Sequence, residues 1–94
     1  MNVYLLIHAI NEAYKSYTYY EVEICYSNKE DALADLEKKV KSIENGTSTN
    51  FPGESIKGEE NNVPFALKYY TFEWTNEGGE KMFTHYYVME MKLK

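Results

Sequence analysis

Only one stretch of this chain has the apolar spacing of an amphipathic helix, and it separates two segments rich in strand-forming residues. Between Ser27 and Gly46, apolar side chains recur every three or four residues, at Ala32, Leu33, Leu36, Val40 and Ile43. This spacing places them on one face of a helix that ends near Glu44. One helix covers only one face of a small sheet, so the other face needs a different role.

The sequence also carries signals for both ends of this helix. Ser27 and Glu30 have the three-residue spacing of a capping box, so we expect Ser27 to be the N-cap. Asn45-Gly46 follows the last apolar position, and glycine readily takes the left-handed conformation that ends many helices.

Strand patterns lie on both sides of the helix. Residues 3–10 are apolar at both alternating sets of positions, which is typical of a central strand covered at least in part on both faces. Residues 17–26 alternate, and the expected core face holds Thr18, Tyr20, Val22, Ile24 and Tyr26. Residues 65–75 and 80–93 predict a hairpin closed by a two- or four-residue turn at Gly78-Gly79. That turn places on the core face Tyr70, Phe72 and Trp74 with Phe83, His85 and Tyr87.

These patterns predict the fold class. We expect residues 1–94 to form a single α+β domain in the order β-β-α-β-β, a four-stranded antiparallel sheet with one amphipathic helix packed on one face. Residues 46–63 hold mostly Gly, Ser, Thr, Asn and Glu, so we expect a long flexible loop there.

Charge and residue usage exclude several classes of function. The net charge is −5, and all ten basic residues are Lys, with no Arg. We therefore expect no nucleic-acid partner, since such proteins carry basic patches with Arg, and no binding to anionic membranes. The apolar segment 3–10 is too short to cross a membrane. Cys25 is the single cysteine, which favours a reducing cytoplasm.

Residues that could carry chemistry are few. His8 and His85 lie on predicted strands, and no nucleophile motif surrounds Cys25, for which we expect a buried thiol. Glu21 and Glu23, with Glu73, would make at best a weak hard-cation site. We therefore predict no catalytic residues, no metal site, no cofactor and no enzymatic activity.

The uncovered sheet face is the most informative candidate for function. Its predicted members are Tyr17, Tyr19, Glu21, Glu23, Tyr69, Thr71, Glu73, Thr84 and Tyr86. Such a face could be solvated, with cross-strand Tyr and Thr pairs that stabilise the sheet. It could also contact a second copy or a partner protein, because Tyr is enriched at interfaces. Alternatively, its Tyr rings could stack on a planar ligand.

The first half of the chain resembles a group of small domains. Residues 3–7, residues 21–27 and the helix with Ala32, Leu36 and Val40 look like small uncharacterised hairpin-helix-hairpin domains of low-GC bacteria and their phages. The resemblance implies a phage or mobile-element protein of the host-takeover or anti-defence type, working in the host cytoplasm. It carries over no functional residue.

These observations together predict a small, non-enzymatic binding protein. It would act through the exposed Tyr/Glu-rich face, as a homo-oligomer or as a binder of a host protein. The alternative is a protein that sequesters a nucleotide signal in a pocket between the open face and the loop at residues 46–63.

Overall fold

The computed structural model describes residues 1–12, 18–48, 51 and 55–93. It contains one helix and five strands in these residues: β1 (Asn2–Glu12), β2 (Thr18–Tyr26), α1 (Lys29–Glu44), β3 (Glu59–Asn61), β4 (Lys68–Thr75) and β5 (Lys81–Lys92). The predicted α+β class is confirmed. The sheet has a fifth strand, β3, so the prediction of four strands is wrong in number.

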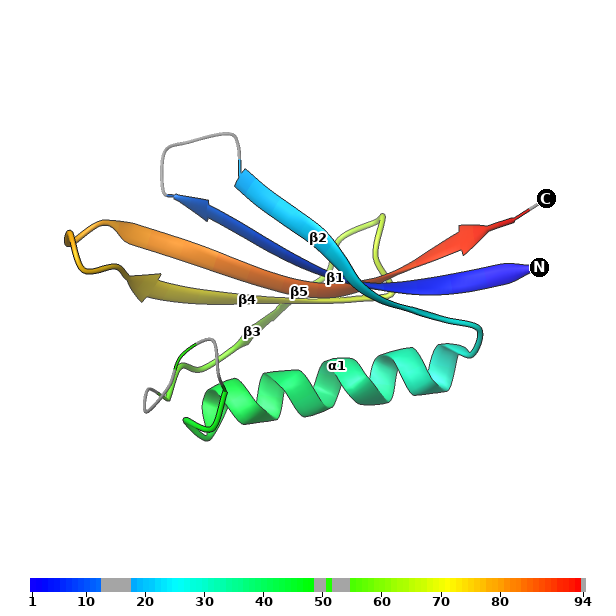
Figure 1. Cartoon of the computed structure of the whole chain (residues 1–94), viewed down its shortest axis with the longest axis horizontal. Coiled ribbons are helices and arrows are strands. Elements are labelled where there is room, and N and C mark those ends of the chain that lie inside the picture. Colours follow the sequence, from blue (N-terminus) through cyan, green and yellow to red (C-terminus); the bar gives the residue numbers. More distant parts are fainter. Residues whose placement is uncertain (13–17, 49–50, 52–54, 94) are drawn as a thin grey trace.

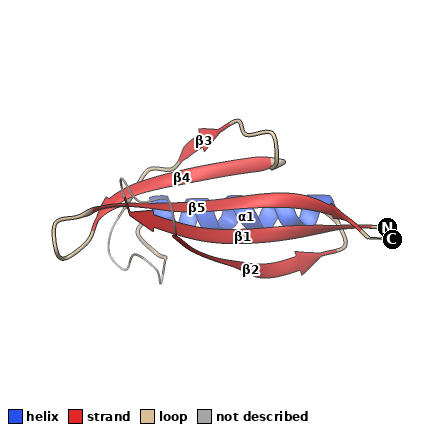
Figure 2. Ribbon diagram, turned by 90° about the horizontal axis from the view of Figure 1, so that it is seen from above, coloured by secondary structure: helices blue, strands red, loops and turns tan. Residues whose placement is uncertain are grey.

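The strands form one antiparallel sheet in the order β2-β1-β5-β4-β3. The first and last strands of the chain pair along their length at the centre of the sheet, so the two termini lie side by side (Figure 1). The Leu93 amide closes this pairing by donating to the Met1 carbonyl at 2.7 Å. Helix α1 lies under one face, and Figure 2 looks down on the other face, with α1 behind the sheet.

Helix α1 begins one residue later than the capping box indicated. Asn28, and not Ser27, is the N-cap, and its side-chain oxygen accepts from the Asp31 amide at 3.2 Å. Both residue types are good N-caps, and the choice between them depends on where the chain leaves β2. The predicted end is confirmed, because Asn45 is the C-cap and Gly46 has a φ of 76°.

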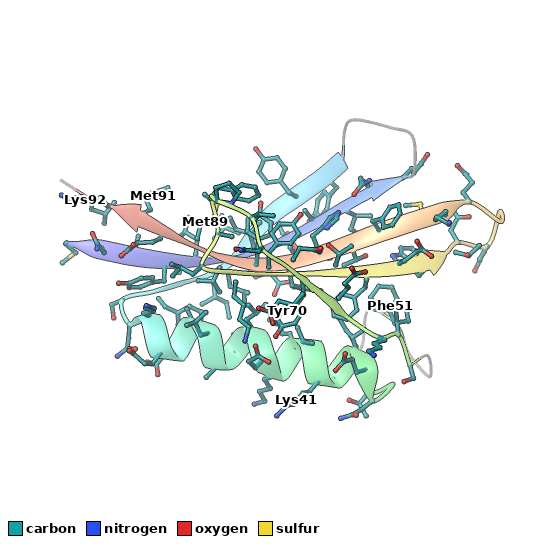
Figure 3. The ribbon with its side chains drawn as sticks, turned by 180° about the vertical axis from the view of Figure 1, so that it is seen from behind. Lys41, Phe51, Tyr70, Met89, Met91 and Lys92 are labelled. Atoms are coloured by element: carbon teal, nitrogen blue, oxygen red, sulfur yellow. The ribbon has the colours of Figure 1, made fainter. Side chains whose placement is uncertain are left out.

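The core lies between α1 and the sheet. The apolar stripe of the helix is buried as predicted at Ala32, Leu36, Val40 and Ile43. It packs against sheet residues of which Leu6, Phe72, Tyr86 and Val88 are almost fully buried. Figure 3 shows Tyr70 between the sheet and the helix, where its hydroxyl donates to Glu37 Oε1 at 2.7 Å.

The segment 46–63 is attached to the helix side of the molecule. The Gly58 amide donates to Glu44 Oε2 at 3.0 Å, and a Cβ at Gly58 would lie 2.8 Å from the Phe72 ring. Phe51 packs edge-on against Trp74 at 5.3 Å between centroids. Residues 59–61 of the predicted loop form β3. The loop therefore lines the edge of the core, and Glu59 and Asn61 reach the open face as part of β3.

Within the described part of the chain, α1 is neither long enough nor apolar enough to span a bilayer.

Candidate functional site: the open sheet face

The turn between β4 and β5 decides which side chains of β5 face the helix. The Asn76 amide donates to the Glu80 carbonyl at 2.9 Å, so three residues form the tip, and Gly79 has a φ of 81°. This is a type of hairpin turn in which a left-handed residue follows a tight turn. The tip is odd in length, whereas we expected two or four residues. Because side chains alternate along a strand, the one-residue shift turns every side chain of β5 to the other face.

This shift corrects the predicted faces of β5. Tyr70 pairs with Tyr86, and Phe72 pairs with Thr84. Thr84 and Tyr86 were expected on the open face, but they lie under the helix and are 0% and 1% exposed. Phe83, His85 and Tyr87 were expected in the core, but they lie on the open face.

An irregularity in the pairing of β1 with β2 corrects the predicted faces of β2. Leu6 pairs with Ile24 but Ile7 pairs with Val22, so Glu23 is an extra residue in β2. Beyond this bulge, His8 pairs with Glu21 and Ala9 pairs with Tyr20. Tyr19, Glu21 and Glu23 therefore lie on the helix side, whereas Tyr20 and Val22, expected in the core, lie on the open face.

The predicted surface is thus divided between two faces. Tyr69, Thr71 and Glu73 lie on the open face as expected, and Tyr17 lies outside the described residues. The other predicted members lie on the helix side: Tyr19, Glu21, Glu23, Thr84 and Tyr86. Glu73 is separated from Glu21 and Glu23 by the sheet, so these three carboxylates do not form one group.

The observed open face is broad and largely apolar. The edge strand β2 and the two strands beside it contribute Val3, Leu5, Ile7 and Ala9 from β1, Tyr20, Val22 and Cys25 from β2, and Phe83, His85, Tyr87, Met89 and Met91 from β5. Met89 and Met91 lie on the side of the sheet away from Tyr70 (Figure 3). Cys25, expected to be buried, is exposed here.

A group of three aromatic rings stands at one side of this face. Tyr69 and Tyr87 stack with centroids 4.8 Å apart. Phe65, from the β3–β4 connection, packs edge-on against both rings, at 5.8 Å and 5.6 Å, and is itself 55% exposed. Burial raises the pKa of both tyrosines, so both phenols are neutral at pH 7.

A chain of polar side chains crosses the centre of the face. His85 Nε2 lies 2.6 Å from Asn11 Oδ1, and its Nδ1 lies 3.1 Å from Thr71 Oγ1. The Asn61 amide donates to the same Thr71 hydroxyl at 2.9 Å. Burial lowers the pKa of His85, which favours the neutral ring. These hydrogen-bonded side chains link four strands without placing a charge among the apolar residues.

Charged side chains are confined to one margin of the face. Among the described strand residues they are Glu59, Glu73 and Lys81, and Glu73 and Lys81 approach each other at 3.8 Å. Depletion of charge at the centre with a charged margin is the pattern of protein–protein interfaces.

The candidate catalytic residues do not converge. His8 lies on the helix side and His85 on the open face. Cys25 pairs with Leu5, and His85 pairs with Ala9, four positions further along β1. Four positions along a strand span about 13 Å, too far for a hydrogen-bonded Cys–His pair.

One signal in the sequence could have located the observed face. Residues 3–10 are apolar at both alternating sets, which indicates apolar surroundings on both sides of the sheet. The structure agrees, because Ile7 and Ala9 on the open face are only 5% and 9% exposed. The partners of β1 on this face, Tyr20 and Tyr87, were misplaced by the bulge and the turn.

Comparison of the chain with protein-family models, with curated proteins and with solved structures finds no match. The resemblance to small domains of low-GC bacteria and phages, and the host-takeover or anti-defence role it implies, stay predictions.

Proposed function

We propose that this protein is a non-enzymatic binding protein that associates with a second copy of itself through the open sheet face. The observation that carries the proposal is the uncharged apolar surface that β1, β2 and β5 present opposite the helix. Val22 is 50% exposed, Tyr20 65% and Met91 46%. Contiguous apolar surface of this kind on a small protein commonly marks an interaction site.

The size of the face suits a stable homodimer. Seen as in Figure 2, the molecule extends 45 Å along the strands and 20 Å across them. A rectangle of those sides has an area of about 900 Å², and a standard interface buries about 800 Å² on each partner. A second sheet packed on this face would therefore use most of it.

A second copy also fits the chemistry of the face. In a two-fold dimer the same patch meets itself, so an uncharged patch has no like charges to bring together. Two such sheets would pack face to face at about 10 Å, as in a β-sandwich. The exposed aromatic rings, with Phe65 and Tyr20 the most exposed, would supply the large contacts that dominate interface energies.

A pair of lysine substitutions tests the proposal. Val22→Lys would bury an unpaired ammonium group in the dimer, and burial of such a charge is costly. Ala34→Lys is the matched control, because Ala34 is exposed on the helix. Both variants change the net charge by the same amount. By sedimentation velocity, we expect wild type and Ala34→Lys to form dimers and Val22→Lys to be a folded monomer.

Two results would count against self-association through this face. A monomeric wild type at high micromolar concentration would do so, and so would a Val22→Lys protein that dimerises as wild type does. The latter result would indicate that the copies associate through their edge strands instead. A wild-type monomer that forms a mixed complex with a host protein would instead favour the heteromeric form of the original prediction.

Binding of a planar ligand such as a nucleotide is the second candidate, and the polar chain around His85 is the observation that favours it. His85, Asn11, Thr71 and Asn61 offer hydrogen-bonding groups beside the stacked Tyr69 and Tyr87 rings. Tyr rings stack on bases, and neutral donors and acceptors read base edges. Native mass spectrometry separates the candidates, since a retained nucleotide adds mass to each copy whereas self-association doubles the mass.

A further inference from the structure

A histidine and two carboxylates meet on the helix side of the sheet, away from the open face. His8 Nδ1 lies 3.6 Å from Glu23 Oε1 and 3.9 Å from Glu21 Oε1. One ligand atom from each of the three residues lies within 4.8 Å of the others. We call these three residues the His8 cluster.

The bulge in β2 assembles this cluster. Glu21 is the direct cross-strand partner of His8 on β1. Glu23 is the extra residue of the bulge and lies between the pairs Leu6–Ile24 and Ile7–Val22. A bulge commonly redirects a side chain, and here both carboxylates approach the same ring nitrogen.

Surrounding residues hold the ligand groups in place. His8 is 8% exposed, and its ring stacks on the buried Tyr86 ring at 4.5 Å with an interplanar angle of 4°. Lys39 Nζ from α1 lies 3.0 Å from Glu23 Oε2 and leaves Oε1 directed at His8. Second contacts of this kind orient the ligands in metal sites. The Glu21 side chain is 48% exposed and leaves a path from solvent.

We propose that the His8 cluster binds a divalent first-row transition ion of the zinc type, with His8 Nδ1, Glu21 and Glu23 as ligands and water in the fourth position. In a tetrahedral site with bonds of about 2.0–2.1 Å, neighbouring ligand atoms lie about 3.3 Å apart. The distances of 3.6 Å and 3.9 Å require only small side-chain movements. One nitrogen and two carboxylate oxygens also suit this class of ion.

The charges of the cluster favour a cation. Glu21 and Glu23 bring two negative charges, and Lys39 balances one of them. The remaining negative charge lies beside the buried His8 ring and attracts a divalent ion. The site is independent of self-association, because it lies on the opposite side of the sheet from the proposed interface.

Isothermal titration calorimetry with zinc chloride tests this proposal. We expect one ion per chain, and an affinity at least about tenfold lower for His8→Gln and for Glu21→Gln, since even loss of a second-shell partner costs about tenfold or more. Three control variants remove other groups that bind zinc: His85→Gln, Cys25→Ser and Glu73→Gln. We expect these to bind as wild type does. The melting temperature should rise with zinc in wild type and controls only.

The proposal is overturned if wild type takes up no zinc, or if Glu21→Gln binds as tightly as wild type. It is also overturned if His85→Gln or Cys25→Ser loses binding, because the ion would then lie elsewhere. If His8→Gln fails to fold, judged by circular dichroism, Glu21→Gln alone decides the question, since the exposed Glu21 side chain is outside the core.

Discussion

Tyr19 and Tyr20 are neighbours in β2 that point to opposite faces of the sheet, and they allow a direct test of the proposed interface. Tyr20 is 65% exposed on the open face, and Tyr19 is 49% exposed on the helix side. Threonine keeps the β-branched character that strands favour, so Tyr20→Thr and Tyr19→Thr should both fold. The sequence patterns alone predicted the opposite assignment of these two residues.

The exposed area of Tyr20 sets the size of the expected effect. An aromatic side chain buries about 200 Å², and 65% of this is about 130 Å². At about 25 cal/mol per Å², and with part of the area retained by threonine, the loss is about 2 kcal/mol per copy. Two copies in a symmetric dimer lose about 4 kcal/mol, or about a thousandfold in Kd. Ordering of each Tyr20 side chain at the interface costs about 0.5–1.5 kcal/mol and offsets part of this loss, so we expect a weakening between about tenfold and a thousandfold.

Sedimentation equilibrium over a range of protein concentrations measures these dissociation constants. We expect Tyr20→Thr to shift toward monomer and Tyr19→Thr to remain within about threefold of wild type. Equal dimerisation of the three proteins, or a larger effect at Tyr19, would show that the open face is not the contact surface. Unfolding in urea checks that both variants keep the fold.

Three further predictions concern the fold itself. Burial and the adjacent Asp35 raise the pKa of Tyr26 to about 12. The contribution of Tyr26 to stability is therefore complete below about pH 10 and falls as the pH rises toward 12, because the unfolded chain releases this proton first. Urea unfolding at about pH 8 and 11 should show a smaller fall for Tyr26→Phe than for wild type, and equal falls would contradict this assignment. Gly79→Ala should cost about 1–2 kcal/mol of unfolding free energy, since the φ of 81° is strained for alanine, whereas Gly78→Ala serves as the control with little change. Tyr86→Ser should cost about 3–5 kcal/mol in the same urea assay, because the side chain is 1% exposed in the core, and a change below about 1 kcal/mol would refute the observed register of β5.

The predicted and observed faces of β2 and β5 differ, and this difference shows why a candidate interface is hard to locate from a sequence of this kind. Tyrosine, valine and methionine alternate with charged residues on only part of these strands. Tyr86 and Tyr87 are adjacent and chemically identical, yet Tyr86 is almost fully buried and Tyr87 is half-buried on the other face. Which of the two is buried depends on the register, and the register depends on the turn.

Local patterns in the sequence were sufficient for the helix, for the existence of four strands and for the inward face of β4. Ala32, Leu36, Val40 and Ile43 are spaced three or four residues apart, as on one face of a helix, and Gly46 marks the helix end. No distant contact is therefore needed to place the helix or its buried face. Tyr70, Phe72 and Trp74 likewise face the helix as predicted.

Only the tertiary structure decided the strand order, the addition of β3 and the faces of β2 and β5. A three-residue tip at Gly79 and one extra residue at Glu23 each shift a strand by a single position. Because strand side chains repeat every two residues, the shift at the tip exchanges the two faces of β5. The extra residue exchanges the faces of β2 only over residues 19–22, and Ile24 and Tyr26 keep the predicted face. These two shifts produce the uncharged open face, and the one at Glu23 brings both carboxylates to His8.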